Sequence, residues 1–545
     1  MTATNRRRGP RDPSLLVAVA VAGALGLFTA VNRFGAVVLP VVPACGLLFW
    51  GAGELLRGRR GVHARFDRVA RHLAHPRQLR HVTSQGVAEA AARLGARTRG
   101  VPGVYVGRGV RGGQDLWGSW EDMHLDIWGP RTGKTTSRAI PSVVAAPGCV
   151  VVASNKRDIV DATRGVRERH GRVWVFDPQN QAGERPSWWW NPLSFIEGSV
   201  RSALLLAGLM AGVNRPSHAR SDGFFEPAGE NLFGYLLLAA QLDDRPITDV
   251  YVWLTNPSDD TPARILRRAG ERRAAATVHM VISSPAKQRA GVYGTALQMA
   301  SFLIAPGIAE WITPSSDGSR LEFRHADFAG SDCETLYLLS EETNKMAAPI
   351  VLSLTTAVAY SAEGRSADCP GGRLPVPALF VLDEAANICP LEELTFFYTH
   401  YGSRGIVMMT FLQSWAQGVA VWGETGMAQL WGSANVRVYG GGVSDMRFLR
   451  DLSQSTGRFE PSVWSLSRHP WWTANPAVGL SSRSEFVLDE ADLAALPRGR
   501  AFVQFSGAPP TLVKPVPWWR GPYAAEIRAS LERYAPKTAA PDRGP

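Results

Sequence analysis

A short loop between an expected strand and an expected helix constrains the fold of this chain more than any other feature. Residues 126–136 read DIWGPRTGKTT. The apolar, strand-like run Met123–Trp128 precedes the loop, and Ser137–Val144, which has helical potential, follows it. Strand, glycine loop and helix follow one another in this order in phosphate-binding loops. The stretch therefore predicts an α/β fold that binds a phosphorylated ligand.

The loop contains the three kinds of group that a nucleoside triphosphate requires. Backbone N–H groups must point at phosphate oxygens, one ammonium must reach the β and γ phosphates, and a hydroxyl must bind Mg²⁺. We expect ATP to bind here, with Lys134 as the ammonium and Thr135 as the hydroxyl ligand. The alternative interpretation is an ordinary strand-to-helix turn. The expected nucleotide contacts are Gly129, Pro130, Arg131, Thr132, Gly133, Lys134, Thr135 and Thr136.

One position departs from the common form of this motif. Trp128 stands five residues before Gly133, where the motif has a glycine. Either Gly129 makes the turn in a loop one residue shorter, or the first glycine has been dispensed with. The identity of Lys134 favours nucleotide binding, because only six of the 59 basic residues in the chain are lysines. A compact, rotatable ammonium stands at the loop of an arginine-dominated chain.

Two adjacent acids further along the chain supply a second half for the same site. The run Ala378–Leu382 has the pattern of a buried strand, and Asp383 and Glu384 follow it directly. In a phosphate-loop enzyme the first such acid holds Mg²⁺, and the next can take a proton from the attacking water. We therefore expect Asp383 to bind the metal and Glu384 to act as general base. The alternative is that both are ordinary solvated acids at a strand end.

Two polar residues flank the next expected strand, Ile406–Phe411. Gln413 follows its end, where an amide could orient water or contact the γ phosphate; otherwise it is a glutamine that starts a helix. Arg404 precedes the strand on a glycine-flanked loop. In a ring assembly Arg404 could reach a neighbouring subunit's phosphate as an arginine finger, and otherwise it is a surface arginine.

The N-terminal part of the chain is basic and apolar. Residues 1–112 contain 18 arginines against four acidic residues, whereas the rest carries 41 basic and 44 acidic residues. The apolar runs Ser14–Val31 and Gly35–Leu56 are each close to the ~20 residues of a membrane-spanning helix. We expect 1–61 to form a transmembrane hairpin with both ends in the cytoplasm, because arginines flank it on its outer sides. A buried helical pair in a soluble domain is the alternative.

The rest of the chain alternates apolar runs with helical segments, as in a parallel α/β unit. We expect a basic juxtamembrane linker over 62–112, an ATPase domain formed by 113–194 and 313–522, and an all-helical insertion over 195–312. A surface loop is expected over Gly364–Pro377 and a C-terminal helix with a disordered tail over 523–545. The five cysteines show no metal-binding spacing, so we expect buried, reduced thiols. Further expected strands are Cys149–Ser154, Val173–Asp177, Thr335–Leu339, Val436–Tyr439 and Ala501–Phe505; expected insertion helices are Arg201–Ala211, Glu230–Gln241, Ile265–Ala275 and Lys287–Ile304.

The motifs of this chain, and the order in which they occur, resemble those of the type IV coupling proteins of conjugation, of the TraG/TraD type. The resemblance covers nearly the whole chain. It implies a RecA-like P-loop ATPase that uses ATP and Mg²⁺, with the roles given above for Lys134, Thr135, Asp383, Glu384 and Gln413. The motifs that carry it, besides the paired apolar runs, are GPRTGKTT, SNKRD, VWVFDPQ, WWWNPL, LFVLDEAANI, SRGI, FLQSW and GGGVSDMRFLRDLSQSTG.

The resemblance also implies partners and a location. Such proteins are hexamers of the bacterial inner membrane that link single-stranded DNA, bound to a relaxase or relaxosome, to a type IV secretion channel. The helical insertion would face the relaxosome, and Gly440–Gly457 would lie on the subunit-interface side. Trp415, Trp422 and Trp431 could stack on bases, or belong to a core or interface. Two rival functions stay open: a double-stranded DNA translocase of the septal type, and a membrane scaffold that binds nucleotide without turnover.

Overall fold

The computed structural model describes residues 63–212, 223–460, 462–467, 477–482 and 484–536. The expected transmembrane hairpin, Cys45 and nearly all of the C-terminal tail lie outside the described residues. The chain divides into two compact units, Met1–Arg65 and Phe66–Pro545. The second unit contains all the elements that position the expected site.

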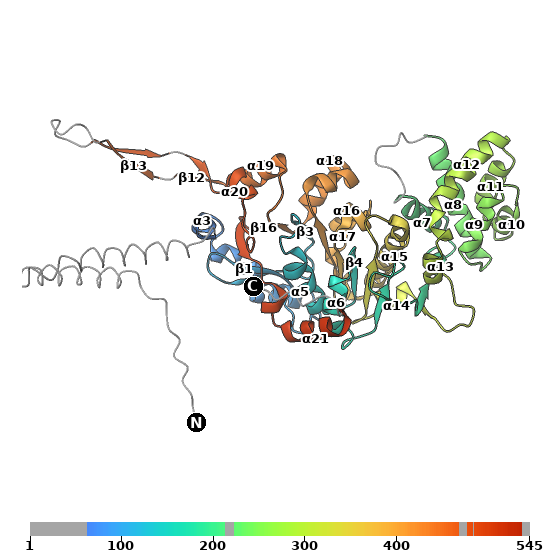
Figure 1. Cartoon of the computed structure of the whole chain (residues 1–545), viewed down its shortest axis with the longest axis horizontal. Helices are drawn as coiled ribbons and strands as arrows, with labels where there is room; N and C mark the ends of the chain where they lie inside the picture. The colour runs from blue at the N-terminus through green and yellow to red at the C-terminus, as the bar shows by residue number, and fades with distance from the viewer. Residues whose placement is uncertain (1–62, 213–222, 461, 468–476, 483, 537–545) are drawn as a thin grey trace, which may run out of the picture. The chain divides into compact units, whose positions relative to one another are not determined.

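An eleven-stranded sheet forms the centre of this unit (Figure 1). Its middle is parallel and runs in the order β11, β3, β10, β9, β4, β8, β5. The α/β prediction is confirmed, and each strand expected from an apolar run is present with ends that agree to within one residue. The bounds are β11 Val436–Tyr439, β3 His124–Ile127, β10 Ile406–Leu412, β9 Ala378–Leu382, β4 Val150–Ser154, β8 Thr335–Leu339 and β5 Val173–Phe176.

Beyond β11 the sheet continues with antiparallel strands. β16 (Ala501–Phe505) pairs with β11, and β17 (Thr511–Lys514), β1 (Val104–Gly109) and β2 (Asp115–Gly118) follow in that order. An apolar run in the sequence predicted β16, but β17, β1 and β2 were not predicted. These are short strands, and β1 includes Gly107 at a φ of 152°, so they give no continuous apolar run.

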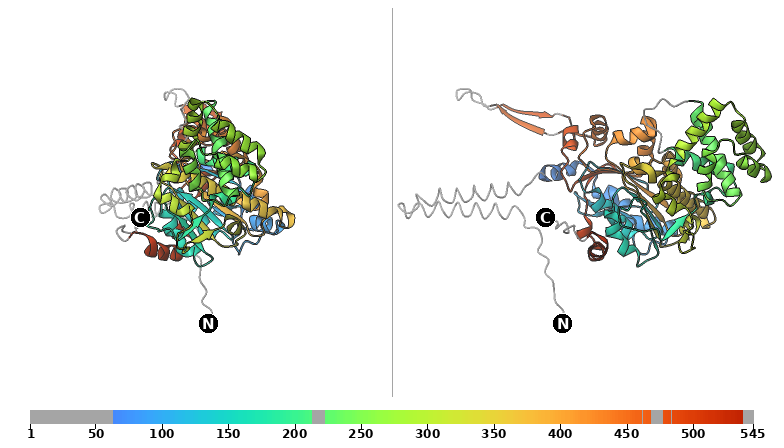
Figure 2. Two further views of the ribbon diagram at one scale, coloured as in Figure 1. Left: turned by 90° about the vertical axis from the view of Figure 1, so that its right-hand side faces the viewer. Right: turned by 45° about the vertical axis from the view of Figure 1, so that its right-hand side comes forward.

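Helices cover both faces of the parallel strands, because successive strand residues point to opposite faces. Val150 and Val152 pack with α5 (Ile140–Ala145), α6 (Asp158–Arg167) and α21 (Ala524–Tyr534). Val151 and Ala153 belong to the larger core on the other face. That core includes α15 (Ala348–Ala367), α16 (Ala385–Ile388), α17 (Leu394–His400) and α18 (Trp415–Ser433). Figure 2 shows the helices on both sides of the sheet.

Part of α15 was expected to be loop. The expected surface loop began at Gly364, whereas α15 continues to Ala367. Among the described residues, Lys345–Ala367 is also the one helix long and apolar enough to cross a membrane, and 78% of its most apolar window is buried inside the protein. Burial in the core of the α/β unit accounts for this hydrophobicity.

The helical insertion, green in Figure 1, enters the fold after β6 (Trp188–Trp190) and leaves through β7 (Leu321–Phe323), which pair in parallel. Neither strand was predicted. One helix was expected over Ile265–Ala275, and this is wrong: the chain turns at Gly270, whose φ is 93°. The helices are α7 Val200–Gly212, α8 Phe225–Leu242, α9 Thr248–Thr255, α10 Thr261–Arg268, α11 Arg272–Ile282, α12 Ala286–Met299 and α13 Pro306–Ile312.

Smaller elements complete the described chain. The bounds are α3 His63–Val69, α4 Ser84–Arg93, α14 His325–Ala329, α19 Met446–Ser455, α20 Glu490–Ala494, and the antiparallel pairs β12 Arg458–Phe459 with β15 Glu485–Phe486 and β13 Ser462–Ser467 with β14 Ala477–Ser482. Of the four described cysteines, all free, Cys149 and Cys389 are buried, but Cys333 and Cys369 are only partly so. The expectation of buried thiols is therefore wrong for these two.

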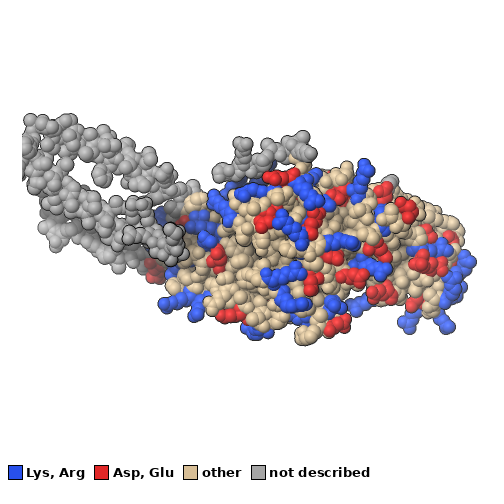
Figure 3. All heavy atoms as spheres, turned by 90° about the horizontal axis from the view of Figure 1, so that it is seen from below, with Lys and Arg blue, Asp and Glu red and all other residues tan. Residues whose placement is uncertain are grey.

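The surface carries charges of both signs. On the face drawn in Figure 3, lysines and arginines are interspersed with aspartates and glutamates over the described residues. This agrees with the near balance of 41 basic and 44 acidic residues beyond residue 112. On this face no single sign of charge covers the described body of the protein.

Candidate functional site

The loop after β3 turns sharply into a helix. Arg131 and Gly133 both have left-handed backbones, with φ of 58° and 100°. The carbonyl of Gly133 accepts hydrogen bonds from the backbone N–H of Ser137 at 3.1 Å and from its hydroxyl at 2.7 Å. Thr135–Ala139 form a wide π-type turn that continues into α5. The first turn, which holds Thr135 and Thr136, therefore presents its N-terminus at the carboxyl edge of the sheet.

Trp128 is a core residue, and its contacts explain the departure from the common motif. The indole is 1% exposed, and its Nε1 donates to Asp126 Oδ1 at 3.1 Å. The ring occupies the space beside Gly440, where an added Cβ would lie 2.0 Å from Trp128 Cδ2. The side chain thus points behind the loop and leaves the ligand side to backbone groups.

A three-glycine segment after β11 supports the loop from behind. Gly129 N donates to Gly441 O at 2.9 Å. A Cβ on Gly129 would lie 2.1 Å from Gly442 O, so the two backbones touch. Gly129 is therefore required by this close approach, whereas the left-handed turn of the loop is made at Arg131 and Gly133, and Gly440–Gly442 have a role within this chain. Their expected place at a subunit interface stays a prediction.

A buried ion pair that the sequence did not suggest fixes the loop to its helix. Arg138, in the first turn, donates to Asp126 Oδ1 at 3.0 Å and to Asp126 Oδ2 at 3.1 Å. Both side chains are fully buried, and Arg138 also contacts His124 Nδ1 at 3.0 Å. Burial and the Arg138 charge hold the pKa of His124 well below its usual range, so the imidazole is neutral. The sequence did contain a signal for this pair. Asp126 and Arg138 are charged residues in apolar segments, and charges that become buried need partners.

Lys134 lies between the two expected acids. Its ammonium is 3.1 Å from Asp383 Oδ1 and donates to Glu384 Oε1. The side chains of Lys134, Asp383 and Glu384 are 14%, 4% and 4% exposed. Burial acts to lower the pKa of Lys134, but Asp383 and Glu384 outweigh it and the pKa is raised. The lysine is therefore charged and bound to the carboxylates.

Gln413 joins this cluster from the end of the neighbouring strand. Its Nε2 donates to Glu384 Oε2 at 2.6 Å. Since β3, β10 and β9 are adjacent and parallel, their carboxyl ends bring Lys134, Gln413 and Asp383-Glu384 to one edge. Ligand sites of open parallel sheets lie at this edge. The structure thus brings together the residues that were expected to act on a nucleotide.

The cluster suits a divalent cation. Asp383 Oδ1 is buried, and its partner among the described residues is the Lys134 ammonium at 3.1 Å, which a bound cation would replace. Thr135 follows Lys134 in the first turn. Carboxylate and hydroxyl oxygens are ligands that Mg²⁺ prefers. Asp383 and Thr135 are therefore the residues that fit the ion.

Arg404 lies elsewhere. It precedes β10, so it is at the amino edge of the sheet, opposite to Lys134. Its guanidinium is 3.2 Å from Glu363 Oε1, and its side chain is 34% exposed. Arg404 therefore takes no part in the site of its own chain, and action on a neighbouring subunit stays a prediction.

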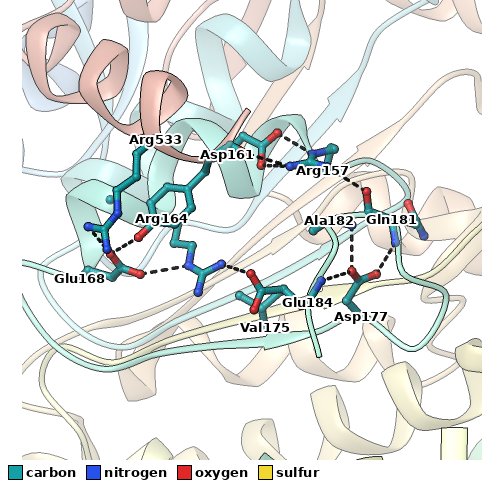
Figure 4. Close-up of polar contacts among 12 residues, drawn as sticks. Arg157, Asp161, Arg164, Glu168, Val175, Asp177, Gln181, Ala182, Glu184 and Arg533 are labelled. Carbon is teal, nitrogen blue, oxygen red and sulfur yellow. Dashed lines mark hydrogen bonds and ion pairs between the residues drawn. The ribbon is translucent and has the colours of Figure 1, made fainter. Parts of the chain in front are cut away.

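Asp177 and Arg157, from two sequence motifs near the site, make structural contacts. Asp177, at the end of β5, accepts hydrogen bonds from the backbone N–H groups of Gln181, Ala182 and Glu184 (Figure 4). Arg157, in the motif SNKRD, binds Asp161 and donates to the Tyr534 carbonyl of α21 at 2.7 Å. The motifs VWVFDPQ and SNKRD therefore close a turn and attach the C-terminal helix to α6.

Trp415, Trp422 and Trp431, which were expected either to stack on bases or to belong to a core or interface, are partly buried and pack against the core. Trp415 stacks on Phe448 at 5.3 Å between ring centroids, and Trp431 meets the same ring edge-on at 5.4 Å. Trp422 Nε1 donates to Leu391 O at 2.7 Å. These contacts give the three residues a place in the packing of α18.

Comparison with known proteins adds a family and a fold. Residues 377–498 match the family described as the TraM recognition site of TraD and TraG. The unbound bacterial conjugative coupling protein TrwB is 18% identical over 72% of this chain and 84% of its own, with a TM-score of 0.52. TrwB in complex with a non-hydrolysable GTP analogue gives 16% identity over 73% and 86%, with the same TM-score of 0.52. No curated protein sequence matches the chain.

The family match contains Asp383, Glu384, Gln413 and the three glycines behind the loop. The likeness to TrwB adds the shared α/β fold over most of both chains. Together they show that residues 377–498 match the TraM recognition site of TraD and TraG, and that the chain shares its fold with the coupling protein TrwB.

Proposed function

We propose that this chain is a membrane-anchored ATPase that couples ATP hydrolysis to DNA transfer into a type IV secretion channel. The observation that carries the proposal is the convergence of Lys134, Asp383, Glu384 and Gln413 at one sheet edge. The cargo is single-stranded DNA or a relaxase–DNA complex. Residues 1–61 anchor the chain in the bacterial inner membrane, with the ATPase domain in the cytoplasm.

The chemistry follows from the geometry of the cluster. Lys134 leaves the two carboxylates and binds the β and γ phosphates, and the loop N–H groups from Arg131 to Thr136 hold the remaining oxygens. Mg²⁺, held by Thr135 and Asp383, supplies charge neutralisation on the phosphates. Glu384, freed from Lys134, accepts the proton of the attacking water. Gln413, 2.6 Å from Glu384, orients that water.

A ring of six copies explains how one such site drives movement. Arg404 of each copy acts at the neighbouring copy's nucleotide, so hydrolysis shifts loops that hold DNA phosphates. The partners are relaxosome proteins, consistent with the TraM recognition family matched by residues 377–498, and the channel components. The near balance of 41 basic and 44 acidic residues beyond residue 112 means that DNA contacts are local, and the face drawn in Figure 3 carries charges of both signs.

The test is ATP hydrolysis by the full-length protein in detergent or nanodiscs, with and without single-stranded DNA. Glu384→Gln is the sharpest variant, because an amide replaces the base at almost unchanged volume. We expect it to bind ATP and to lose turnover by about 100-fold or more. Equal turnover in the parent and in Glu384→Gln would contradict the proposal. ATP binding without turnover in any form would favour a scaffold, and equal stimulation by double-stranded DNA would favour a septal-type translocase.

A further inference from the structure

A chain of side-chain amides leads away from the proposed general base. Gln413 N donates to Gln417 Oε1 at 2.8 Å. Gln417 Nε2 donates to Asn387 Oδ1 at 2.9 Å, and Asn387 Nδ2 donates to Glu342 Oε1 at 2.7 Å. We propose that Gln417, Asn387 and Glu342 are positioning residues that hold Gln413 and Glu384 in their hydrolytic arrangement. The inference rests on the proposed ATPase function.

The orientation of every amide in this chain is determined by its two ends. A carboxylate can only accept hydrogen bonds and a backbone N–H can only donate. Glu342 therefore turns the NH₂ of Asn387 toward itself, which leaves Asn387 Oδ1 for Gln417. Gln417 must then give its NH₂ to Asn387 and its oxygen to Gln413 N. No amide can rotate by 180° without losing both of its contacts.

The chain crosses the carboxyl edge of the sheet. Gln413 follows β10, Asn387 lies on α16 after β9, and Glu342 lies on the loop after β8. Glu342 Oε2 also accepts from Asn155 Nδ2, after β4, at 3.4 Å. The sheet order is β10, β9, β4, β8. The loops after four neighbouring strands are thus joined to the site by side-chain hydrogen bonds.

Glu384 requires such support. Its φ of 56° is a left-handed backbone, which is costly for a residue with a Cβ and persists where the surroundings fix it. Lys134 holds one of its carboxylate oxygens and Gln413 the other. Once Lys134 moves to the phosphates, Gln413 is the partner that remains. The amide chain keeps Gln413 in place during that exchange.

Helix capping explains only part of these contacts. Ser414 caps α18 and accepts from Gln417 N at 3.2 Å, and a glutamine at this position commonly bonds back to the helix start. Capping accounts for a contact of Gln417 with the helix start, although the donor is Gln413 N, one residue before the N-cap Ser414. It does not account for the second contact, from Gln417 to Asn387, or for the contact from Asn387 to Glu342.

A double-mutant cycle on the full-length protein separates positioning from capping. Asn387→Asp keeps the oxygen that faces Gln417 but places a carboxylate against Glu342. We expect kcat to fall about tenfold with KM nearly unchanged. Glu342→Gln alone should lower kcat less than Asn387→Asp does, because its amide oxygen can still face Asn387 while its NH₂ loses the contact with Asn155 Nδ2. In the double variant the new amide at position 342 donates to the new carboxylate at position 387 and accepts from Asn155, so kcat should recover.

Hydrogen exchange of the Gln413 amide in the nucleotide-free protein gives a readout that does not need turnover. We expect faster exchange in Asn387→Asp and recovery in the double variant, with equal Tm in all three. Additive losses, or exchange that is unchanged in Asn387→Asp, would overturn the positioning chain. If the parent protein hydrolyses no ATP, the proposed function fails, and the exchange measurement alone decides whether the chain holds Gln413.

Discussion

Lys134 Nζ lies 3.1 Å from Asp383 Oδ1, although the two residues are far apart in the chain. They come from strands that are separated in the sheet by β10 alone. The contact closes the two halves of the candidate site onto each other without a nucleotide. An incoming triphosphate therefore has to replace carboxylates as the partner of the lysine.

This contact predicts an effect of Lys134 on stability as well as on turnover. Lys134→Ala leaves Asp383 and Glu384 adjacent, buried and unpaired, which should destabilise the protein by about 3 kcal/mol and abolish hydrolysis. Adding Glu384→Gln removes one of the two charges, so part of the lost stability should return while turnover stays absent. Urea unfolding of the two variants checks this, and a double variant less stable than Lys134→Ala would contradict it.

The buried pair behind the loop should matter far more than a surface pair. Arg138→Met leaves the buried Asp126 carboxylate without a cation, and we expect a loss of about 3–5 kcal/mol. Arg108→Ala removes an exposed pair with Asp115, whose side chains are 56% and 41% exposed, and should cost less than about 1 kcal/mol. Denaturant midpoints measured on both variants test the difference. Similar losses would show that Asp126 is neutral or solvated.

The contact between Trp128 and Gly440 predicts a size-dependent coupling. Gly440→Ala places a methyl group against the indole and should destabilise the protein by about 1–3 kcal/mol. Trp128→Leu removes the opposing ring, so the penalty of Gly440→Ala should shrink in the double variant. Gly432→Ala, in α18 with no neighbour near its Cβ, is the control and should leave the Tm unchanged or raise it. Simple additivity would mean that the two residues do not touch.

A buried histidine beside the helical insertion predicts a pH dependence of stability. His325 is 5% exposed, and its Nδ1 accepts from Trp190 Nε1 at 3.3 Å. Burial lowers the pKa of His325 to about 4, so the folded state binds its proton less readily than the unfolded state. Its stabilisation is complete above pH ~6.5 and is lost as the pH falls toward 4, by about 3 kcal/mol at most. His325→Asn, which can still accept from Trp190, should flatten that part of the stability profile measured by urea unfolding. An unchanged slope between about pH 6.5 and 4 would contradict the assignment.

The sequence predicted those parts of the site that depend on local pattern and on one rule of parallel sheets. Asp383, Glu384 and Gln413 each lie just after an apolar run, and the carboxyl ends of adjacent parallel strands must meet. All parallel strands end at the same edge of the sheet, so these residues could be expected at one edge without knowledge of the strand order.

Contacts made by distant segments could not be predicted in this way. The partner of Asp126 and the space filled by Trp128 depend on which segments pass behind the loop, and nothing in residues 126–136 specifies Gly440. Arg404 was expected to reach a neighbouring subunit's phosphate from its glycine-flanked loop, and within its own chain the whole length of β10 separates it from Gln413. The break between α10 and α11 was missed because the helical periodicity continues across Gly270.

The two ends of the helical insertion are tied together by three-residue strands, β6 and β7, which lie side by side. A segment whose ends meet can be replaced by another of different length without moving the sheet that carries it. Recombination between related elements could therefore exchange the outward-facing helices as a cassette. The insertion would diversify in this way while the proposed ATPase site is inherited intact.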